Sequence, residues 1–341
     1  MITIGQVGLG SWGPNVLRNF QNLPGSRVKI CCDLDETALA RVQSQYADIE
    51  TTADYGRLLD DDELDAIVVT ASARAHYALA RAALERNKHV FVEKPLALRV
   101  AEARELVMIA RQRDRRLMVG HLLLYHPAVQ HLKASIRAGE LGELRYIYSQ
   151  RLNLGQVRRD ENAMWSLAPH DISVALYLLE QEPVSASAQG RDFLRSGVDD
   201  LAFLTINFAG GQLAHCHVSW LDPHKVRRLT VVGSQKMAVF DDMAPREKLT
   251  VFDQGVDFPN VGYPDLHTLR FGDIYIPRID MREPLQVECQ HFVQSVEDGT
   301  TPLTDGRNGL SVLRVLAAAQ ESLERGGVPV ALERMEEEST P

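Results

Sequence analysis

The chain has 341 residues, 45% of them hydrophobic and 24% charged, a content that suits two globular domains and excludes a disordered protein. Its formal net charge of −9 at pH 7 argues against a non-specific nucleic-acid binder, which needs a broad basic face. The apolar runs are too short to span a membrane and no secretory signal follows Met1, so we expect a cytoplasmic protein.

In the first 120 residues, short β-branched runs alternate with longer helical patterns. We expect strands at 2–7, 27–33, 65–70, 89–93 and 116–121, separated by helices near 13–22, 36–46, 74–86 and 99–113. This alternation is typical of a doubly wound parallel sheet, the Rossmann class of α/β fold. We assign it to a domain over residues 1–121.

The pattern changes after residue 121. We expect helices at 127–138, 164–179, 284–298 and 306–325, and strands at 144–150, 201–208, 212–220, 226–233, 237–241 and 248–252. The hairpin-sized gaps between strands indicate an antiparallel or mixed sheet in an α+β domain over residues 122–341. Such a sheet leaves one broad face uncovered, which predicts a homodimer or homotetramer formed through it.

The cysteines and paired histidines do not form a metal-binding pattern. Cys31, Cys32, Cys216 and Cys289 show no C-x-x-C spacing, so we expect free thiols. His215 and His217 lie on one face of an expected strand, without a carboxylate or a further cysteine at ligand spacing. We therefore predict packing on the sheet for these histidines, and no metal site.

The stretch GQVGLGSWGPN, residues 5–15, contains a G-x-G-x-x-G loop between an expected strand and an expected helix. In this context Gly8 allows the tight turn, Gly10 admits a pyrophosphate to the backbone, and Gly13 lets the helix pack on the strand. Ser11 and Trp12 complete the loop. The helix N-terminus then offers N–H groups to the phosphates, so we predict a dinucleotide site.

Asp33 ends the second strand, twenty residues after Gly13, where an acidic side chain can accept hydrogen bonds from both ribose hydroxyls. It would repel a 2′-phosphate, and the next residue is Leu34 rather than an arginine. NAD is therefore favoured over NADP. The alternative role for Asp33 is to cap the next helix, but Asp35 is better placed for that.

The stretch VFVEKPLA, residues 90–97, places Glu93 and Lys94 at the carboxyl end of a central strand. Ligands bind at this end of open α/β sheets. Taken alone, Lys94 is equally consistent with a surface lysine at a strand end. The glycine loop at the start of the same sheet makes the combination more specific.

Together, the G-x-G-x-x-G loop, the E-K-P tripeptide and a later histidine on a helix resemble the glucose–fructose oxidoreductase and inositol dehydrogenase family. The resemblance covers essentially the whole chain. It implies an N-terminal Rossmann domain, a C-terminal domain with a large open, mostly antiparallel sheet, and NAD(P)-dependent chemistry on sugar or cyclitol carbons. It also implies that Lys94 is the catalytic lysine, that the Lys94–Pro95 bond is cis, and that His170 is the catalytic histidine.

This assignment fits the chemistry of alcohol oxidation. A neutral imidazole can accept the hydroxyl proton while hydride leaves the same carbon, and an ammonium group stabilises the developing alkoxide. His170 is expected to lie on an amphipathic helix. Without the resemblance, a histidine in such a place is more often structural. Two departures from the family pattern are Ser166, where an aspartate often precedes the histidine, and Ala71, where a proline often follows Thr70. Because Ser166 replaces that aspartate, we expect a different proton relay, which involves Asp171 or a group of the substrate.

The resemblance adds further cofactor positions, namely Thr70, His76, Glu93 and His121. For His121 a buried histidine at a strand end is an equal alternative. Three segments around residues 120–133, 151–171 and 218–237 resemble members that act at carbon 3 of nucleotide-activated amino sugars in surface-polysaccharide pathways. Beside Lys94 and His170, this adds Arg151, Asn153, Arg158, Arg159, Asn162, Trp165 and Asp171 as candidate substrate contacts. Alternatively, residues 158–161 form a solvated loop of mixed charge.

The leading hypothesis is thus an NAD-dependent oxidoreductase that acts on a nucleotide sugar. Alternatives are an NAD-using glycosidase that oxidises carbon 3 transiently, an inositol or free-sugar dehydrogenase, and a non-catalytic sensor such as the galactose-pathway repressor. The presence of both Lys94 and His170 argues against the sensor.

Overall fold

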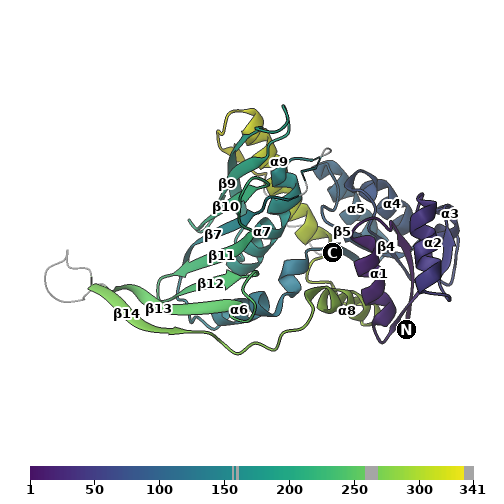
Figure 1. Ribbon diagram of the computed structural model, residues 1–341, viewed down its shortest axis with the longest axis horizontal. Coiled ribbons are helices and arrows are strands. Elements are labelled where there is room, and N and C mark those ends of the chain that lie inside the picture. Colours follow the sequence, from purple (N-terminus) through teal and green to yellow (C-terminus); the bar gives the residue numbers. More distant parts are fainter. Residues whose placement is uncertain (156, 159–160, 258–267, 334–341) are drawn as a thin grey trace. The chain divides into compact units, whose positions relative to one another are not determined.

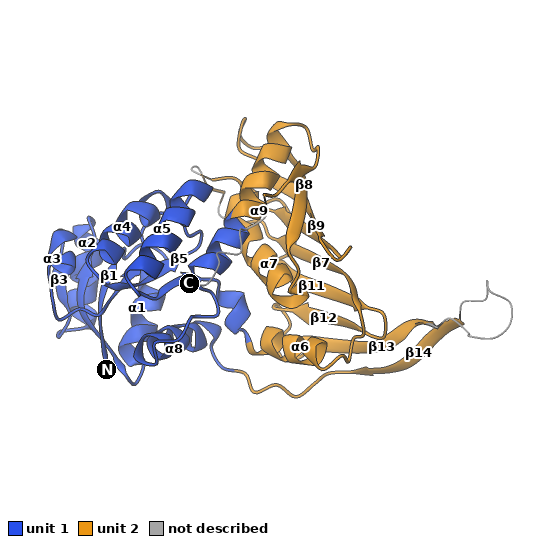
Figure 2. Ribbon diagram, turned by 180° about the vertical axis from the view of Figure 1, so that it is seen from behind, with its two compact units in different colours: residues 1–126, 282–313 blue, residues 127–281, 314–341 orange. Residues whose placement is uncertain are grey.

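A computed structural model describes residues 1–155, 157–158, 161–257 and 268–333 of the chain. The chain divides into two compact units (Figure 2). Unit 1 comprises Met1–His126 together with Arg282–Leu313, and unit 2 comprises Pro127–Met281 and the chain from Arg314 onward.

Unit 1 is built on a six-stranded parallel sheet with the order β3-β2-β1-β4-β5-β6. Figure 1 labels its strands β4 and β5 among the helices of this unit. The strands are β1 (Ile2–Val7), β2 (Ser26–Cys32), β3 (Glu50–Thr52), β4 (Ala66–Val69), β5 (His89–Glu93) and β6 (Leu117–Gly120). All four residues of β4 are buried, as expected of an apolar strand covered on both faces. The predicted doubly wound sheet is confirmed, although the short β3 was not predicted.

Five helices of unit 1 begin and end within one residue of the predicted positions, whereas the short helices at 56–59 and 122–125 were not predicted. The helices of unit 1 are α1 (Gly13–Asn22), α2 (Glu36–Gln45), α3 (Gly56–Leu59), α4 (Ala73–Glu85), α5 (Val100–Gln112), the 3₁₀ helix η1 (Leu122–Tyr125) and α8 (Pro284–Glu297). Asp35 caps α2, because its Oδ1 accepts a hydrogen bond from the Thr37 backbone N–H at 2.9 Å. This confirms the prediction that Asp35, rather than Asp33, caps this helix.

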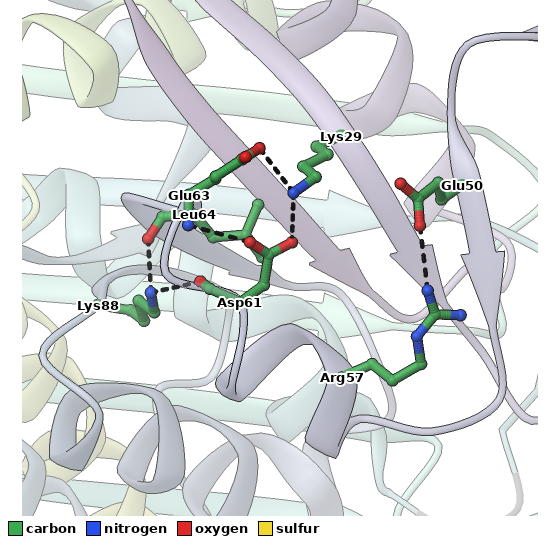
Figure 3. Close-up of polar contacts among 7 residues, drawn as sticks. All are labelled: Lys29, Glu50, Arg57, Asp61, Glu63, Leu64 and Lys88. Carbon is green, nitrogen blue, oxygen red and sulfur yellow. Dashed lines mark hydrogen bonds and ion pairs between the residues drawn. The ribbon is translucent and has the colours of Figure 1, made fainter.

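Charged side chains anchor the amino ends of the central strands (Figure 3). The Lys29 ammonium lies 2.7 Å from Asp61 and 2.8 Å from Glu63. Lys88 donates to the carbonyls of Asp61 and Leu64, at 2.7 and 2.8 Å. A neighbouring exposed pair joins Arg57 to Glu50 at 3.1 Å. Since β4 and β5 start here, these contacts hold the amino ends of the strands, and the glycine loop lies at the opposite, carboxyl ends.

The segment Arg282–Leu313 packs in unit 1, whereas the predicted division at residue 121 placed it in the C-terminal domain. Phe292 of α8 lies edge-to-face with Phe20 and Phe91, at centroid distances of 6.0 and 5.8 Å. Thr304 makes two hydrogen bonds with Val119 of β6. The Thr304 carbonyl accepts the Val119 N–H at 2.8 Å, and the Thr304 hydroxyl donates to the Val119 carbonyl at 2.7 Å. These apolar and polar contacts explain why the segment joins unit 1.

Unit 2 contains a nine-stranded sheet with the order β14-β13-β12-β11-β7-β10-β9-β8-β15. The strands are β7 (Leu144–Leu152), β8 (Pro183–Arg191), β9 (Leu201–Phe208), β10 (Leu213–Ser219), β11 (Val226–Gly233), β12 (Met237–Asp241), β13 (Leu249–Asp257), β14 (Thr268–Tyr275) and β15 (Val330–Ala331). Among the strands that the structure describes in this sheet, only β7 and β10 pair in parallel, so the sheet is mostly antiparallel, as expected. The prediction missed β8, β14 and β15, and β13 extends five residues beyond the predicted end at 252.

The helices α6 (Pro127–Arg137), α7 (Ala163–Leu179) and α9 (Gly306–Glu324) complete the fold, and α9 crosses from unit 1 into unit 2. Helix α7 packs on β7, β9 and β10. Twelve of its seventeen residues are buried, so it is not the amphipathic helix that we expected. A helix enclosed on most sides needs apolar residues all round.

The other face of the sheet carries the predicted histidine packing. The rings of Phe203 and His217 stack at a centroid distance of 4.4 Å. All four cysteines are buried free thiols. In the described part of the chain, no helix has the length and apolarity to cross a membrane, and no three His, Cys, Asp or Glu side chains gather as a metal site.

Candidate functional site

The glycine loop between β1 and α1 has the geometry that its sequence predicts. Gly8 has φ +98°, and a β-carbon there would lie 2.3 Å from the Ala71 backbone nitrogen. A β-carbon on Gly13 would lie 2.4 Å from the Gly8 carbonyl oxygen, so the start of α1 packs directly on the turn. A β-carbon on Gly10 would meet no atom within 4 Å. This open space beside the backbone fits the approach of a pyrophosphate.

Two buried polar side chains brace the loop from within unit 1. The Gln6 amide donates to the Gly13 carbonyl at 2.9 Å and to the Thr70 hydroxyl at 3.0 Å, and that hydroxyl donates to the Gly8 carbonyl at 2.5 Å. Thr70, a candidate cofactor contact, therefore has its hydroxyl engaged with the loop itself. We did not single out Gln6 from the sequence, although a glutamine within the apolar run ITIGQV was a usable signal.

Asp33 lies just after β2 and reaches the glycine loop. One carboxylate oxygen accepts the Leu9 N–H at 2.5 Å, and the other accepts the Asp35 N–H at 2.9 Å. A carboxylate has about four acceptor positions, so room is left for two ribose hydroxyls. The backbone contacts hold this carboxylate in place before any ligand binds.

Glu93 and Lys94 lie at the carboxyl end of β5, on the same edge of the sheet as the loop. Glu93 accepts a hydrogen bond from the indole N–H of Trp12 at 2.8 Å, which ties β5 to the glycine loop. Its other oxygen accepts the Lys94 backbone N–H at 3.3 Å. The Lys94–Pro95 peptide bond is cis, as the resemblance implied.

His76 of α4 lies between two backbone segments of this edge. Its Nδ1 is 2.8 Å from the Pro95 carbonyl oxygen and its Nε2 is 3.0 Å from that of Ala71. Burial lowers the pKa of the imidazole, against the effect of these two contacts. Since both ring nitrogens are engaged, His76 connects the loops that follow β4 and β5.

His121 follows β6 and is only 1% exposed. Neither ring nitrogen has a hydrogen-bond partner among the described residues. Burial, and then the charge of Lys94, lower the pKa of His121 to about 3, so the ring is neutral. A buried neutral imidazole with both nitrogens unused can still bind a ligand, which leaves both roles considered for His121 open.

In unit 2, His170 occupies one of the five positions of α7 that are not buried. The next residue, Asp171, is buried and forms a bidentate pair with Arg151 of β7, with N···O distances of 2.8 and 3.3 Å. This ion pair joins α7 to the sheet, and each of the two charged groups has the other as its partner. It also occupies the carboxylate that we considered as a relay for His170.

The segment before α7 is anchored by its polar side chains. Asn162 caps the helix by accepting the Trp165 N–H at 3.0 Å, and both side chains donate to Gln320 at 3.1 Å. Arg158 pairs with Glu161 at 3.0 Å, as in a loop of mixed charge, while its side chain stays 49% exposed and accessible to a ligand. The Asn153 N–H donates to the Ser219 carbonyl at 3.2 Å, and Arg159 lies outside the described residues.

Two family models match the chain in series. The model of the oxidoreductase family GFO_IDH_MocA, NAD-binding Rossmann fold, matches residues 2–121, and the GFO/IDH/MocA C-terminal domain matches residues 129–239. The chain belongs to the GFO/IDH/MocA family. It is an NAD-binding oxidoreductase, and the open loop at Gly10 with the acceptor at Asp33 fits that cofactor.

Relatives within the GFO/IDH/MocA family differ in the substrates that their names state. The scyllo-inositol 2-dehydrogenase (NAD(+)) of Bacillus subtilis is 26% identical and aligns over 96% of this chain and 95% of its own length. The UDP-N-acetylglucosamine 3-dehydrogenase of Acidithiobacillus ferrooxidans is 28% identical over 75% of this chain and 77% of its length. A structure of that enzyme, GnnA, covers 95% of this chain and 98% of its own, with a TM-score of 0.82 at 22% identity, which shows a shared fold.

Proposed function

We propose that this GFO/IDH/MocA protein oxidises a secondary alcohol of a sugar with NAD, and that its substrate is a nucleotide-activated amino sugar oxidised at carbon 3. The observation that carries the proposal is the alignment of three quarters of the chain with a UDP-N-acetylglucosamine 3-dehydrogenase. The site adds support, because Glu93 ties the strand end that carries Lys94 to the glycine loop through Trp12.

The proposed cofactor site is the edge of unit 1 formed by the glycine loop, Asp33 and the end of β5. The α1 N-terminus and the Gly10 backbone would receive the pyrophosphate, and Asp33 the ribose hydroxyls. When bound, NAD accepts the hydride that the substrate carbon loses. Two side chains would act by shaping this edge: Thr70 holds the glycine loop, and His76 connects the loops that follow β4 and β5.

The proposed catalytic residues are Lys94 and His170. The Lys94 ammonium would stabilise the negative charge that develops on the alcohol oxygen, and the His170 imidazole would accept its proton. Both would act on the same oxygen atom, so the effect of removing one should depend on whether the other is present. Because the Asp171 carboxylate is paired with Arg151, we assign it no proton in this step.

For the sugar diphosphate, the ion pairs of unit 2 give a reason to prefer one candidate arginine over another. Arg151 is committed to Asp171, whereas the side chain of Arg158 is 49% exposed beside Glu161. We therefore propose Arg158, with the neighbouring Arg159, as the phosphate contact. Asn162 and Trp165 would shape the wall of the substrate pocket through their hydrogen bonds to Gln320. Asn153 remains a candidate contact to the substrate, through an uncharged side chain.

A second candidate is an inositol dehydrogenase. The scyllo-inositol 2-dehydrogenase of Bacillus subtilis aligns over 96% of the chain, more than the nucleotide-sugar enzyme does, at a similar identity. The same Lys94 and His170 chemistry would serve a ring alcohol of a cyclitol. An uncharged cyclitol, however, would give Arg158 and Arg159 no phosphate to bind.

NADH formation, followed by absorbance, tests the proposal. The purified protein would be mixed with NAD and, in turn, UDP-N-acetylglucosamine, scyllo-inositol, myo-inositol and glucose, with the Lys94→Met variant as control. We expect the highest kcat/KM with the nucleotide sugar, and loss of activity in the variant. A higher kcat/KM with an inositol would replace the first candidate by the second, and activity that survives Lys94→Met would place the chemistry elsewhere.

A further inference from the structure

Trp12 occupies a helix position that its residue type does not favour. It is the N-cap residue of α1, and among the described residues its side chain makes no capping hydrogen bond. Asparagine, aspartate, serine and threonine are preferred there, because their side-chain oxygens accept N–H groups of the first turn. An indole has only a donor. Trp12 therefore leaves the N–H groups of that turn available to a pyrophosphate, and its own N–H makes a contact elsewhere.

That contact is with the end of β5. The Trp12 indole N–H donates to one carboxyl oxygen of Glu93 at 2.8 Å, and the other oxygen accepts the Lys94 backbone N–H at 3.3 Å. The carboxyl group also lies against β6, where a β-carbon on Gly120 would approach it to 3.0 Å. The Glu93 carboxyl group thus bridges the glycine loop and the Lys94 backbone.

A second contact holds the residue that follows Lys94. The Pro95 carbonyl oxygen lies 2.8 Å from Nδ1 of His76, whose Nε2 lies 3.0 Å from the Ala71 carbonyl oxygen. His76 is 2% exposed, whereas Trp12 is 41% exposed. The backbone around Lys94 is therefore held by a buried ring on the Pro95 side, and on its other side by hydrogen bonds that begin in the glycine loop.

We propose that Trp12 is a positioning residue for Lys94. Its indole N–H holds the Glu93 carboxyl group, and that group holds the Lys94 backbone, so the placement of the lysine depends on the conformation of the glycine loop. A pyrophosphate bound at Gly10 and the α1 N-terminus fixes the residues around Trp12, so cofactor binding also steadies Lys94. This rests on the function proposed above, in which Lys94 acts on the alcohol oxygen.

The alternative role for Trp12 is a direct contact to NAD, and the exposed part of its ring leaves room for one. The two roles change different measurements. A cofactor contact acts on the affinity for NAD, whereas a positioning role acts on kcat and on the order of the Lys94 backbone. Misplacing a catalytic group by about 1 Å can cost about 100-fold in rate.

Trp12→Phe, which keeps an aromatic ring and removes the N–H donor, tests the contact to Lys94. Hydrogen exchange at the Lys94 backbone amide, followed by NMR in the full chain, should become about five- to tenfold faster, as expected for the loss of about one hydrogen bond. Saturating NAD should slow this exchange in the wild type and have much less effect in the variant. The measurements use about pH 8, because burial raises the pKa of Glu93 to about 7 and both bonds are strongest to the carboxylate.

The matched control is Trp165→Phe, which removes the same N–H from an indole that donates to Gln320 at 3.1 Å. Exchange at Lys94 should then stay within about twofold of the wild type. Glu93→Gln is a second variant, whose single amide oxygen replaces the two carboxyl oxygens, and it should also speed the exchange. Combined with Trp12→Phe it should cause no faster exchange than the faster single variant, because each change interrupts the same series of contacts.

Kinetics separate positioning from a merely structural role. With the substrate that the wild type oxidises, Trp12→Phe should lower kcat about 10- to 100-fold and change the KM for NAD by less than about threefold. Circular dichroism checks that the variant is folded. An unchanged kcat with weaker NAD binding would overturn the proposal and make Trp12 a cofactor contact. Equal exchange at Lys94 in the wild type and in folded Trp12→Phe would also overturn it, and this measurement needs no sugar, so it decides the contact to Lys94 even where the proposed substrate is wrong.

Discussion

Replacing Arg151 by methionine should destabilise unit 2 strongly, because it leaves the Asp171 carboxylate buried without its cation. The Arg151 and Asp171 side chains are 9% and 4% exposed and make two hydrogen bonds, at 2.8 and 3.3 Å. Removing one partner of a buried ion pair costs about 3–5 kcal/mol, whereas an exposed pair is worth about 0–1 kcal/mol. We therefore expect a loss of about 3–5 kcal/mol in the free energy of unfolding.

Urea denaturation measures this loss, with tryptophan fluorescence as the readout. Two of the three tryptophans, Trp165 and Trp220, lie in unit 2. The midpoint should fall with an unchanged slope. The double variant Arg151→Met with Asp171→Asn should recover part of the loss, because no buried charge is then left uncompensated.

The matched control is Arg325→Met, which breaks an exposed pair with Glu321 at 2.8 Å and should change the stability by less than about 1 kcal/mol. A loss below about 1 kcal/mol in Arg151→Met would refute the reasoning. It would mean that the Arg151 guanidinium is available to a ligand, as the sequence first indicated.

Three further predictions concern the cofactor, the chemistry and the assembly. Asp33→Ser removes the acceptor for the ribose hydroxyls and for Leu9, so the ratio of NAD to NADP affinity should fall in fluorescence titrations; an unchanged ratio would contradict this role. Lys94→Met and His170→Ala should each lower kcat about 10²- to 10⁴-fold while NAD still binds, and the double variant should lose less than the product of the two losses. If the losses multiply, the two residues do not act on one oxygen. Light scattering should give a homodimer or homotetramer through the unit 2 sheet, and a mass of 38.1 kDa, that of one chain, would disprove it.

The sequence predicted the strands of unit 1 well, because buried parallel strands are continuous apolar runs bounded by helical patterns. The missed strands lack this signal. β3 has the polar sequence ETT, β8 reads PVSASAQGR with small and polar residues, and most described residues of β14 are exposed. Such strands are held by pairing with their neighbours, and local sequence does not reveal this pairing.

The tertiary contacts of the predicted elements could not be read from the sequence either. The helix at 284–297 was predicted, but local periodicity does not tell which sheet it covers, and its place in unit 1 depends on Phe292 meeting Phe20 and Phe91. The spacing of the glycine motif indicated Gly8 and Asp33, whereas Lys94 was assigned from the family resemblance. The pairing of Arg151 with Asp171, twenty residues apart, depends on α7 lying on β7 and could not be deduced from charge patterns.

The most direct test of the central claim uses UDP-N-acetylglucosamine with deuterium at carbon 3, incubated with the protein and NAD and followed by mass spectrometry of the reduced nicotinamide. Hydride transfer from carbon 3 predicts NADH that carries one deuterium, formed by the wild type and not by Lys94→Met. Reduced nicotinamide without deuterium, or none at all while another sugar or an inositol is oxidised, would contradict the account.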